Sequence, residues 1–152
     1  MIRRYTVLLA FALWMGGFTF YALIVIPTGA KVLGGEREVG FITQQVTNWL
    51  NALGVLTLLI LAWNMFAEGN GVARRWLALA WTGMTVSQVG LFLLHPVIDR
   101  MLDRANLKIH DLGHFYYWHR AYLLTVTVQW LAALLYLWVA LLIWREADRQ
   151  KS

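Results

Sequence analysis

The residues best suited to bind a metal ion or haem are four histidines within one quarter of the chain. His110 and His114 are four residues apart, as are His95 and Asp99, so each pair would share one face of a helix. Zinc, iron or copper takes three or four ligands of this kind. Haem takes one or two axial histidines, a role that His95 and His119 could share across two facing helices. The cluster therefore indicates a haem or transition-metal site as one interpretation.

Two helix-weakening residues favour a simpler role for the same histidines. Pro96 follows His95, and Gly113 lies between His110 and His114, so neither pair need lie on a continuous helix. The competing interpretation is that these histidines lie at the membrane interface or cap a helix. A pH-sensing role is a third interpretation, because the unperturbed pKa of histidine is about 6.5.

A second group of polar residues lies within otherwise apolar stretches and on shared helical faces. Its members are Gln44, Asn48, Asn51, Thr85, Gln88, Tyr122 and Gln129. In an up-and-down bundle these faces fall in the same half of the molecule, which predicts one outward-facing polar pocket or network. The competing interpretation is that they only join helices by hydrogen bonds, worth roughly 0.6–2 kcal/mol each.

The sequence lacks the residues that common catalytic mechanisms need. There is no cysteine, which excludes disulfides, thiolate metal ligands, iron–sulfur clusters and a cysteine nucleophile. No Asp, Glu, Lys or Arg interrupts the middle of an apolar stretch, which argues against a proton-driven transporter. No nucleotide-binding loop, Ser-His-Asp order or His-Glu-x-x-His motif is present. We therefore expect no catalytic residues, and an enzyme is the less favoured class.

Four long apolar stretches must position these side chains. They cover about residues 5–26, 41–66, 76–95 and 117–144, and each reaches the roughly 20 residues that a helix needs to cross a bilayer. The chain is 60% hydrophobic and 14% charged, whereas an ordinary soluble domain has about 25% charged residues. We predict an all-α fold: a single integral membrane domain over 1–152, built as a four-helix, up-and-down transmembrane bundle.

The connections between these stretches are short. Glycines break the helix over 27–40, a tight turn is expected over 67–75, and the longest connection is 96–115. Apolar residues at helical spacing over 97–104 predict a short helix at the membrane interface. Asp111 is a suitable N-cap for the last helix.

The distribution of basic residues predicts the orientation. If the N-terminus is cytoplasmic, the inner segments hold Arg3, Arg4, Arg74, Arg75, Arg145, Arg149 and Lys151. The outer segments hold Lys31, Arg37, Arg100, Arg104, Lys108 and Arg120. The inner segments are shorter, so their positive charge is denser, and both termini are predicted to be cytoplasmic. The net charge of +5 fits a membrane surface better than nucleic acid, and no nucleic-acid partner is expected.

Several short strings resemble a known group of proteins. They are residues 14–20 (WMGGFTF), 26–34 (IPTGAKVLG), 94–96 (LHP) and 115–120 (FYYWHR). Together they resemble small bacterial four-helix integral membrane proteins of unknown function and, more distantly, copper-resistance-type membrane domains. The resemblance covers most of the chain and implies the four-helix architecture and a bacterial inner (cytoplasmic) membrane. It brings no activity with it, but that group has a histidine at the head of its last helix, which draws attention to His119.

The leading hypothesis is a non-enzymatic polytopic membrane protein, either a small binding module or an accessory subunit of a larger membrane complex. Its partners would be the lipid bilayer and other membrane subunits or a second copy of itself. The first alternative is a redox or metal-handling membrane protein with haem or a transition metal at the histidine cluster. The second alternative is a channel or carrier for a small solute, for which the inner half offers only Asn64 and Thr57 as polar candidates.

Overall fold

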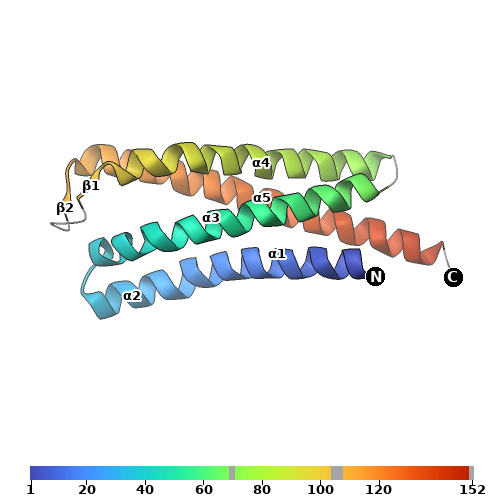
Figure 1. Ribbon diagram of the computed structural model, residues 1–152, viewed down its shortest axis with the longest axis horizontal. Helices are drawn as coiled ribbons and strands as arrows, with labels where there is room; N and C mark the ends of the chain where they lie inside the picture. The colour runs from blue at the N-terminus through green and yellow to red at the C-terminus, as the bar shows by residue number, and fades with distance from the viewer. Residues whose placement is uncertain (69–70, 104–107, 151–152) are drawn as a thin grey trace.

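The computed structural model describes residues 1–68, 71–103 and 108–150. The first membrane-length helix comprises α1 (Ile2–Phe20), the π-helical segment η1 (Tyr21–Val25) and α2 (Ile26–Leu33). Three further long helices follow: α3 (Glu36–Ala67), α4 (Val72–Asp99) and α5 (Leu112–Arg149). A small antiparallel hairpin of β1 (Leu102–Asp103) and β2 (Lys108–Ile109) joins α4 to α5. The long helices run up and down, and the two termini lie at the same end (Figure 1).

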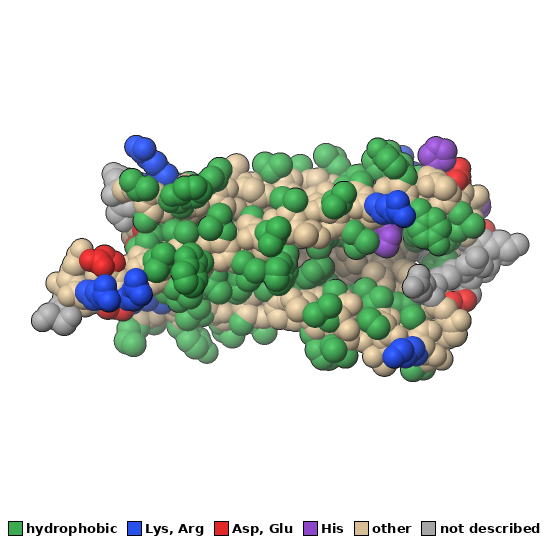
Figure 2. Space-filling model, turned by 180° about the vertical axis from the view of Figure 1, so that it is seen from behind, with side chains coloured by type: hydrophobic (Ala, Val, Ile, Leu, Met, Phe, Trp, Pro, Cys, Tyr) green, Lys and Arg blue, Asp and Glu red, His purple; other side chains and the backbone are tan. Residues whose placement is uncertain are grey.

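All four long helices are long and apolar enough to cross a membrane. Their outer faces carry large exposed apolar side chains, such as Leu13, Leu59, Leu93 and Trp138, and these cover the flanks of the bundle in Figure 2. Apolar side chains outside and hydrogen-bonded polar side chains inside suit lipid as the surrounding solvent. The chain is thus an integral membrane protein, and the predicted all-α four-helix bundle is confirmed.

The first helix extends further than the sequence predicted. The expected connection over 27–40 is wrong in extent, because the helix runs through Pro27 to Leu33. The turn before the proline widens to π geometry, and the Ile26 N–H donates to the Tyr21 carbonyl five residues back. This wider turn makes room for the proline ring, which has no N–H and would crowd a regular α-helix. The helix ends at Gly34, whose φ of 85° is left-handed and suits glycine.

The helix expected over 97–104 is also wrong. Helix α4 continues through Pro96 to Asp99, and residues 102–103 then pair with 108–109 as a hairpin. The Arg100 N–H donates to the Pro96 carbonyl at 3.2 Å, and the His110 N–H donates to the Met101 carbonyl at 3.0 Å. Proline blocks only the bond from its own nitrogen, so the helix can continue for a turn beyond it. Residue 104 lies outside the described part of the chain.

The bundle is packed more tightly at one end than at the other. We call the end with both termini the terminal end and the opposite end, with β1 and β2, the hairpin end. Helices α4 and α5 pack antiparallel through small residues: a Cβ on Gly83 would lie 3.6 Å from Ala132, and one on Gly90 would lie 3.4 Å from Thr125. The continuous apolar core lies in the middle and toward the terminal end. At the hairpin end the surface is hollowed, and histidine side chains gather there (Figure 2).

Candidate functional site

A chain of side-chain amides crosses the middle of the bundle. The Gln88 amide on α4 donates to Asn51 Oδ1 on α3 at 3.3 Å, and the Gln129 amide on α5 donates to Gln88 Oε1 at 2.8 Å. The Gln129 amide also approaches the Met84 carbonyl at 3.4 Å. All three side chains are buried. The structure therefore brings together three of the residues that the sequence proposed as a polar network.

A glycine on α3 makes room for this amide chain. A Cβ added at Gly54 would lie 2.7 Å from Gln88 Oε1 and 2.9 Å from the indole nitrogen of Trp14 on α1. Any other residue at this position would displace one of these groups, because real Cβ contacts are not that short. Side chains from α1 and α4 thus pack against Gly54 of α3, and Gln88 links this contact to Gln129 on α5.

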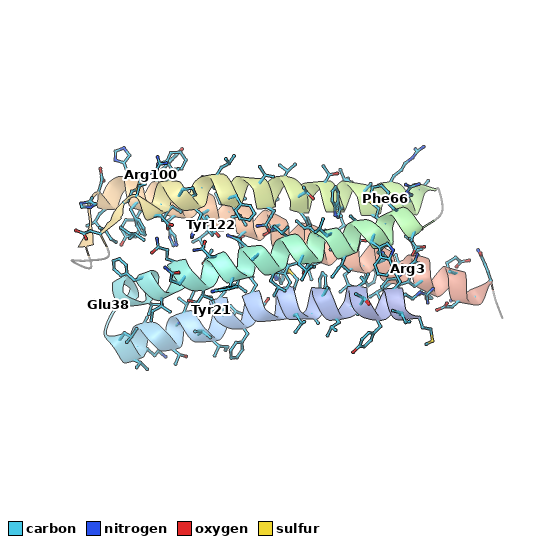
Figure 3. The ribbon with its side chains drawn as sticks, viewed as in Figure 1. Arg3, Tyr21, Glu38, Phe66, Arg100 and Tyr122 are labelled. Atoms are coloured by element: carbon cyan, nitrogen blue, oxygen red, sulfur yellow. The ribbon has the colours of Figure 1, made fainter. Side chains whose placement is uncertain are left out.

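The polar residues continue from the amide chain toward the hairpin end. Tyr122 on α5 interacts with the Asn51 side chain and lies between the α4–α5 pair and α3 (Figure 3). Its ring lies 6.3 Å from that of His95, centroid to centroid. One helical turn further on, Asp99 Oδ2 lies 3.5 Å from His95 Nε2, which is beyond ordinary hydrogen-bond length. Gln88, Asn51, Tyr122, His95 and Asp99 thus form a line that we call the polar line.

Two atoms at the outer end of the polar line lack hydrogen-bond partners. His95 Nε2 and Asp99 Oδ1 are both shielded from the surface, and neither has a hydrogen-bond partner among the described residues. The two side chains as a whole stay partly accessible, at 15% and 27% exposure. Buried polar atoms are nearly always satisfied, so unsatisfied ones in a reachable place indicate a site for a water molecule or a ligand.

The remaining candidates for the polar pocket do not all join this line. Gln44 is buried on α3, three turns nearer the hairpin end than Gly54, whereas Asn48 is exposed. The Thr85 hydroxyl donates to the Trp81 carbonyl of its own helix at 2.9 Å. A threonine satisfied in this way needs no partner on another helix. The helical face predicted for α3 therefore divides into buried and exposed positions.

The histidines beyond the hairpin are spread along the start of α5. His110 precedes the helix, so the expectation that it shares a helical face with His114 is wrong. Asp111 is the N-cap, as predicted, and its carboxylate accepts from the His114 backbone N–H at 3.0 Å and lies 2.7 Å from His114 Nδ1. The hydrogen bond from that backbone N–H lowers the pKa of the exposed Asp111 carboxyl. His114 thus contributes to a helix cap.

The geometry gives the metal interpretation no further support. Among the described residues, no group of three or more His, Cys, Asp or Glu side chains lies close enough to hold a metal ion. The ring of His119 stacks on Phe115, with centroids 5.6 Å apart and planes within 9°. The register of α4 against α5 places His95 level with the helical turn that carries His119. The hypothesis that His95 and His119 share a haem is therefore supported only by their similar level along the bundle.

A second buried polar group lies nearer the terminal end. The Asn64 amide donates to the Tyr136 hydroxyl at 3.1 Å, and that hydroxyl donates to the Leu61 carbonyl at 2.7 Å. The sequence analysis named Asn64 as a polar candidate but not Tyr136, because a tyrosine within a hydrophobic stretch gives no clear polar signal. Met84 and Ala133 of the apolar core lie between this pair and the amide chain, and the buried Thr57 hydroxyl in the same layer donates to the Leu53 carbonyl of its own helix at 2.9 Å. The described residues therefore form two separate polar groups along the bundle.

Charged residues at the terminal end form a cluster that the sequence did not indicate. Arg3 pairs with Glu68 at 2.5 Å, and the Trp144 indole N–H donates to the same carboxylate at 3.3 Å. Arg4 pairs with Asp148 at 2.7 Å and lies over the Trp144 ring, 5.5 Å from its centroid. The only signal for these contacts is that each residue lies at the end of an apolar stretch. The cluster joins α1, α5 and the α3–α4 turn.

Comparisons with known proteins add no relative. No family model, no curated protein and no solved structure matches the chain. The resemblance to small bacterial membrane proteins and to copper-resistance-type domains therefore gains no support from them. The fold and the polar line define the class: a polytopic integral membrane protein built as a four-helix bundle, with an apolar core and a line of polar side chains within it.

Proposed function

We propose that this protein is a non-enzymatic membrane binding module, working alone or as an accessory subunit of a larger membrane complex. Its site is the hairpin-end part of the polar line, where Tyr122, His95 and Asp99 lie. The observation that carries the proposal is the pair of unsatisfied buried atoms, His95 Nε2 and Asp99 Oδ1, on side chains that are still 15% and 27% exposed. A partner or ligand that hydrogen-bonds to these atoms would remove the cost of leaving them unpaired, about 1–3 kcal/mol for each group.

The interior amides support this site without forming it. Asn51, Gln88 and Gln129 have partners among themselves, so they join helices in the way that polar residues do in membranes. Because Asn51 also interacts with Tyr122, the amide chain holds the inner wall of the site in place. In this proposal the deeper polar residues join helices by hydrogen bonds, and those nearer the hairpin end form the binding site.

The proposed setting follows from charge. We place the terminal end in the cytoplasm, on the basis of its denser arginines, and the hairpin end on the outer side. The membrane we propose is the bacterial inner (cytoplasmic) membrane. Under this assignment the site opens outward, away from the cytoplasm.

The first experiment is to analyse what the purified protein carries. The full chain is purified in detergent, and its absorption spectrum, metal content and extracted small molecules are measured for wild type, His95→Ala and Asp99→Asn. Asn48→Ala is the control, because Asn48 is a polar residue on an exposed face of α3. We expect a colourless protein without stoichiometric metal, and a bound organic molecule that the two site variants lose and the control retains.

Other outcomes would overturn the proposal. A Soret band lost in His95→Ala or His119→Ala, or stoichiometric metal lost in either variant, would establish the haem or metal alternative. If both site variants lowered stability but changed nothing that the protein carries or binds, His95 and Asp99 would be structural residues only.

A further inference from the structure

We infer that the site at the hairpin end receives a primary ammonium group. This inference rests on the proposed function, because it names the ligand chemistry of the same site. It follows from three observations: an uncompensated carboxylate, the number of acceptor atoms around it, and its depth in the bundle.

The Asp99 carboxylate has no cationic partner within the described part of the chain. The nearest ion-pairing group is His95, at 3.5 Å from Oδ2, and a histidine is charged only when protonated. One carboxylate oxygen, Oδ1, is wholly buried without a hydrogen-bond donor. The side chain as a whole is 27% exposed, so it is Oδ1 that is shielded from water, and a buried carboxylate oxygen is stabilised by a positive charge or a hydrogen-bond donor that faces it. The missing group is therefore a cation that also donates hydrogen bonds.

The acceptor atoms fit an ammonium group better than a metal ion. Asp99 Oδ1 and Oδ2 accept, and His95 Nε2 accepts when its proton is on Nδ1. Three acceptors match the three N–H donors of a primary ammonium, with charge-assisted bonds of about 2.7–2.9 Å. A metal ion would need a third protein ligand, and no such group of three is present among the described residues. A quaternary ammonium has no N–H and could not satisfy these atoms.

The depth of the site places it where lipid head groups lie. Arg75 and Asp99 mark the two ends of α4 and are 24 residues apart, which is about 36 Å along a helix. The hydrocarbon core of a bilayer is about 30 Å thick, so Asp99 lies at the interface when Arg75 lies at the other one. Lipid ethanolamine head groups and free amines can both present a primary ammonium at this level.

The test measures binding of lipids that differ only at nitrogen. The full-length protein, purified and stripped of lipid in detergent, is titrated with phosphatidylethanolamine or with phosphatidylcholine of the same acyl chains, and bound lipid is counted by native mass spectrometry. We expect the ethanolamine lipid to bind at least about tenfold more tightly, and Asp99→Asn to remove that preference. Asp111→Asn is the matched control, because it removes a carboxylate at the same end and keeps the helix cap.

Free ethanolamine distinguishes the two sources of the ammonium group. If it displaces the lipid, the site recognises the ammonium alone, and if it does not, the acyl chains are part of the ligand. Should Asp99→Asn fail to fold, the comparison of the two lipids on the wild-type protein still decides. Equal binding of both lipids would overturn the inference.

The same experiment separates this inference from the proposed function. If a molecule without a primary ammonium group is extracted from the wild type and lost in Asp99→Asn, the proposed binding site is supported and the inferred ammonium ligand is wrong. If neither lipid nor any extracted molecule distinguishes wild type from Asp99→Asn, the proposed function and the ammonium inference are both wrong.

Discussion

Replacing Gly54 by alanine tests whether the amide chain organises the middle of the bundle. The new methyl group would lie 2.7 Å from Gln88 Oε1 and 2.9 Å from Trp14 Nε1. The indole is part of a buried ring and has little freedom, so Gln88 must move. Moving it breaks the 2.8 Å hydrogen bond that its Oε1 accepts from Gln129. A change of one methyl group is therefore transmitted to a third helix.

The expected cost comes from three contributions. Overpacking a closely packed interior costs about 1–3 kcal/mol. Losing an interhelical hydrogen bond in a membrane protein costs about 0.6–1.7 kcal/mol. Replacing glycine by alanine in a helix contributes about 0.5–1 kcal/mol in the opposite direction. The net loss for Gly54→Ala is therefore about 1–4 kcal/mol of unfolding free energy.

The measurement is the unfolding free energy of detergent-solubilised protein, followed by circular dichroism during denaturation. Gly83→Ala is the control, because a Cβ there would lie 3.6 Å from Ala132, an ordinary contact, and this variant should be neutral or slightly more stable. A double variant with Gln88→Ala should recover part of the loss, because the clashing amide is gone. If Gly54→Ala were as stable as Gly83→Ala, the tight packing of Gln88 and Trp14 against Gly54 would be wrong.

Three further variants test other parts of the molecule. Tyr136→Phe removes the partner of the Asn64 amide and should cost about 1–3 kcal/mol in unfolding free energy, with protein yield and fold otherwise unchanged. Glu68→Gln should destabilise more than Asp148→Asn when both are unfolded side by side, because Glu68 is 12% exposed and Asp148 is 61% exposed, and exposed ion pairs contribute about 0–1 kcal/mol. Asp111→Ala should speed amide exchange in the first turn of α5. Because the folded-state pKa of Asp111 lies below the ordinary 3.8, the cap stabilises above that value and the effect should vanish as the pH falls through the lowered pKa.

The four helices were predictable because length and apolar composition alone determine which segments can cross a bilayer. The meeting of Asn51, Gln88 and Gln129 was predictable too, because up-and-down threading fixes which helix halves lie side by side. The partner of Asn64 was not predictable in the same way. Tyrosine is apolar along most of its side chain, so Tyr136 gave no polar signal until its hydroxyl was placed against another helix.

Proline and local pairing account for the errors in the connections. Pro27 looked like the end of a helix, but a single widened turn before it lets the helix continue to Leu33. The apolar spacing over 97–104 resembled a helix, but the hydrogen bond from His110 to Met101 closes a hairpin instead. Such choices depend on contacts between segments that are distant in the sequence, and local periodicity does not record them.

The placement of unsatisfied atoms argues for a site at the hairpin end rather than deeper in the bundle. Asn64 Oδ1 is also buried without a partner, but Asn64 is completely enclosed, at 0% exposure, so a ligand has no route to it. His95 and Asp99 keep 15% and 27% of their side chains accessible, in the last turns of α4 at the hairpin end. At the terminal end, by contrast, Arg3 joins α1 to the α3–α4 turn and Arg4 joins α1 to α5. The ion pairs join the helices at the terminal end, and the partly exposed side chains with unsatisfied atoms lie at the hairpin end, which supports the binding site that we propose there.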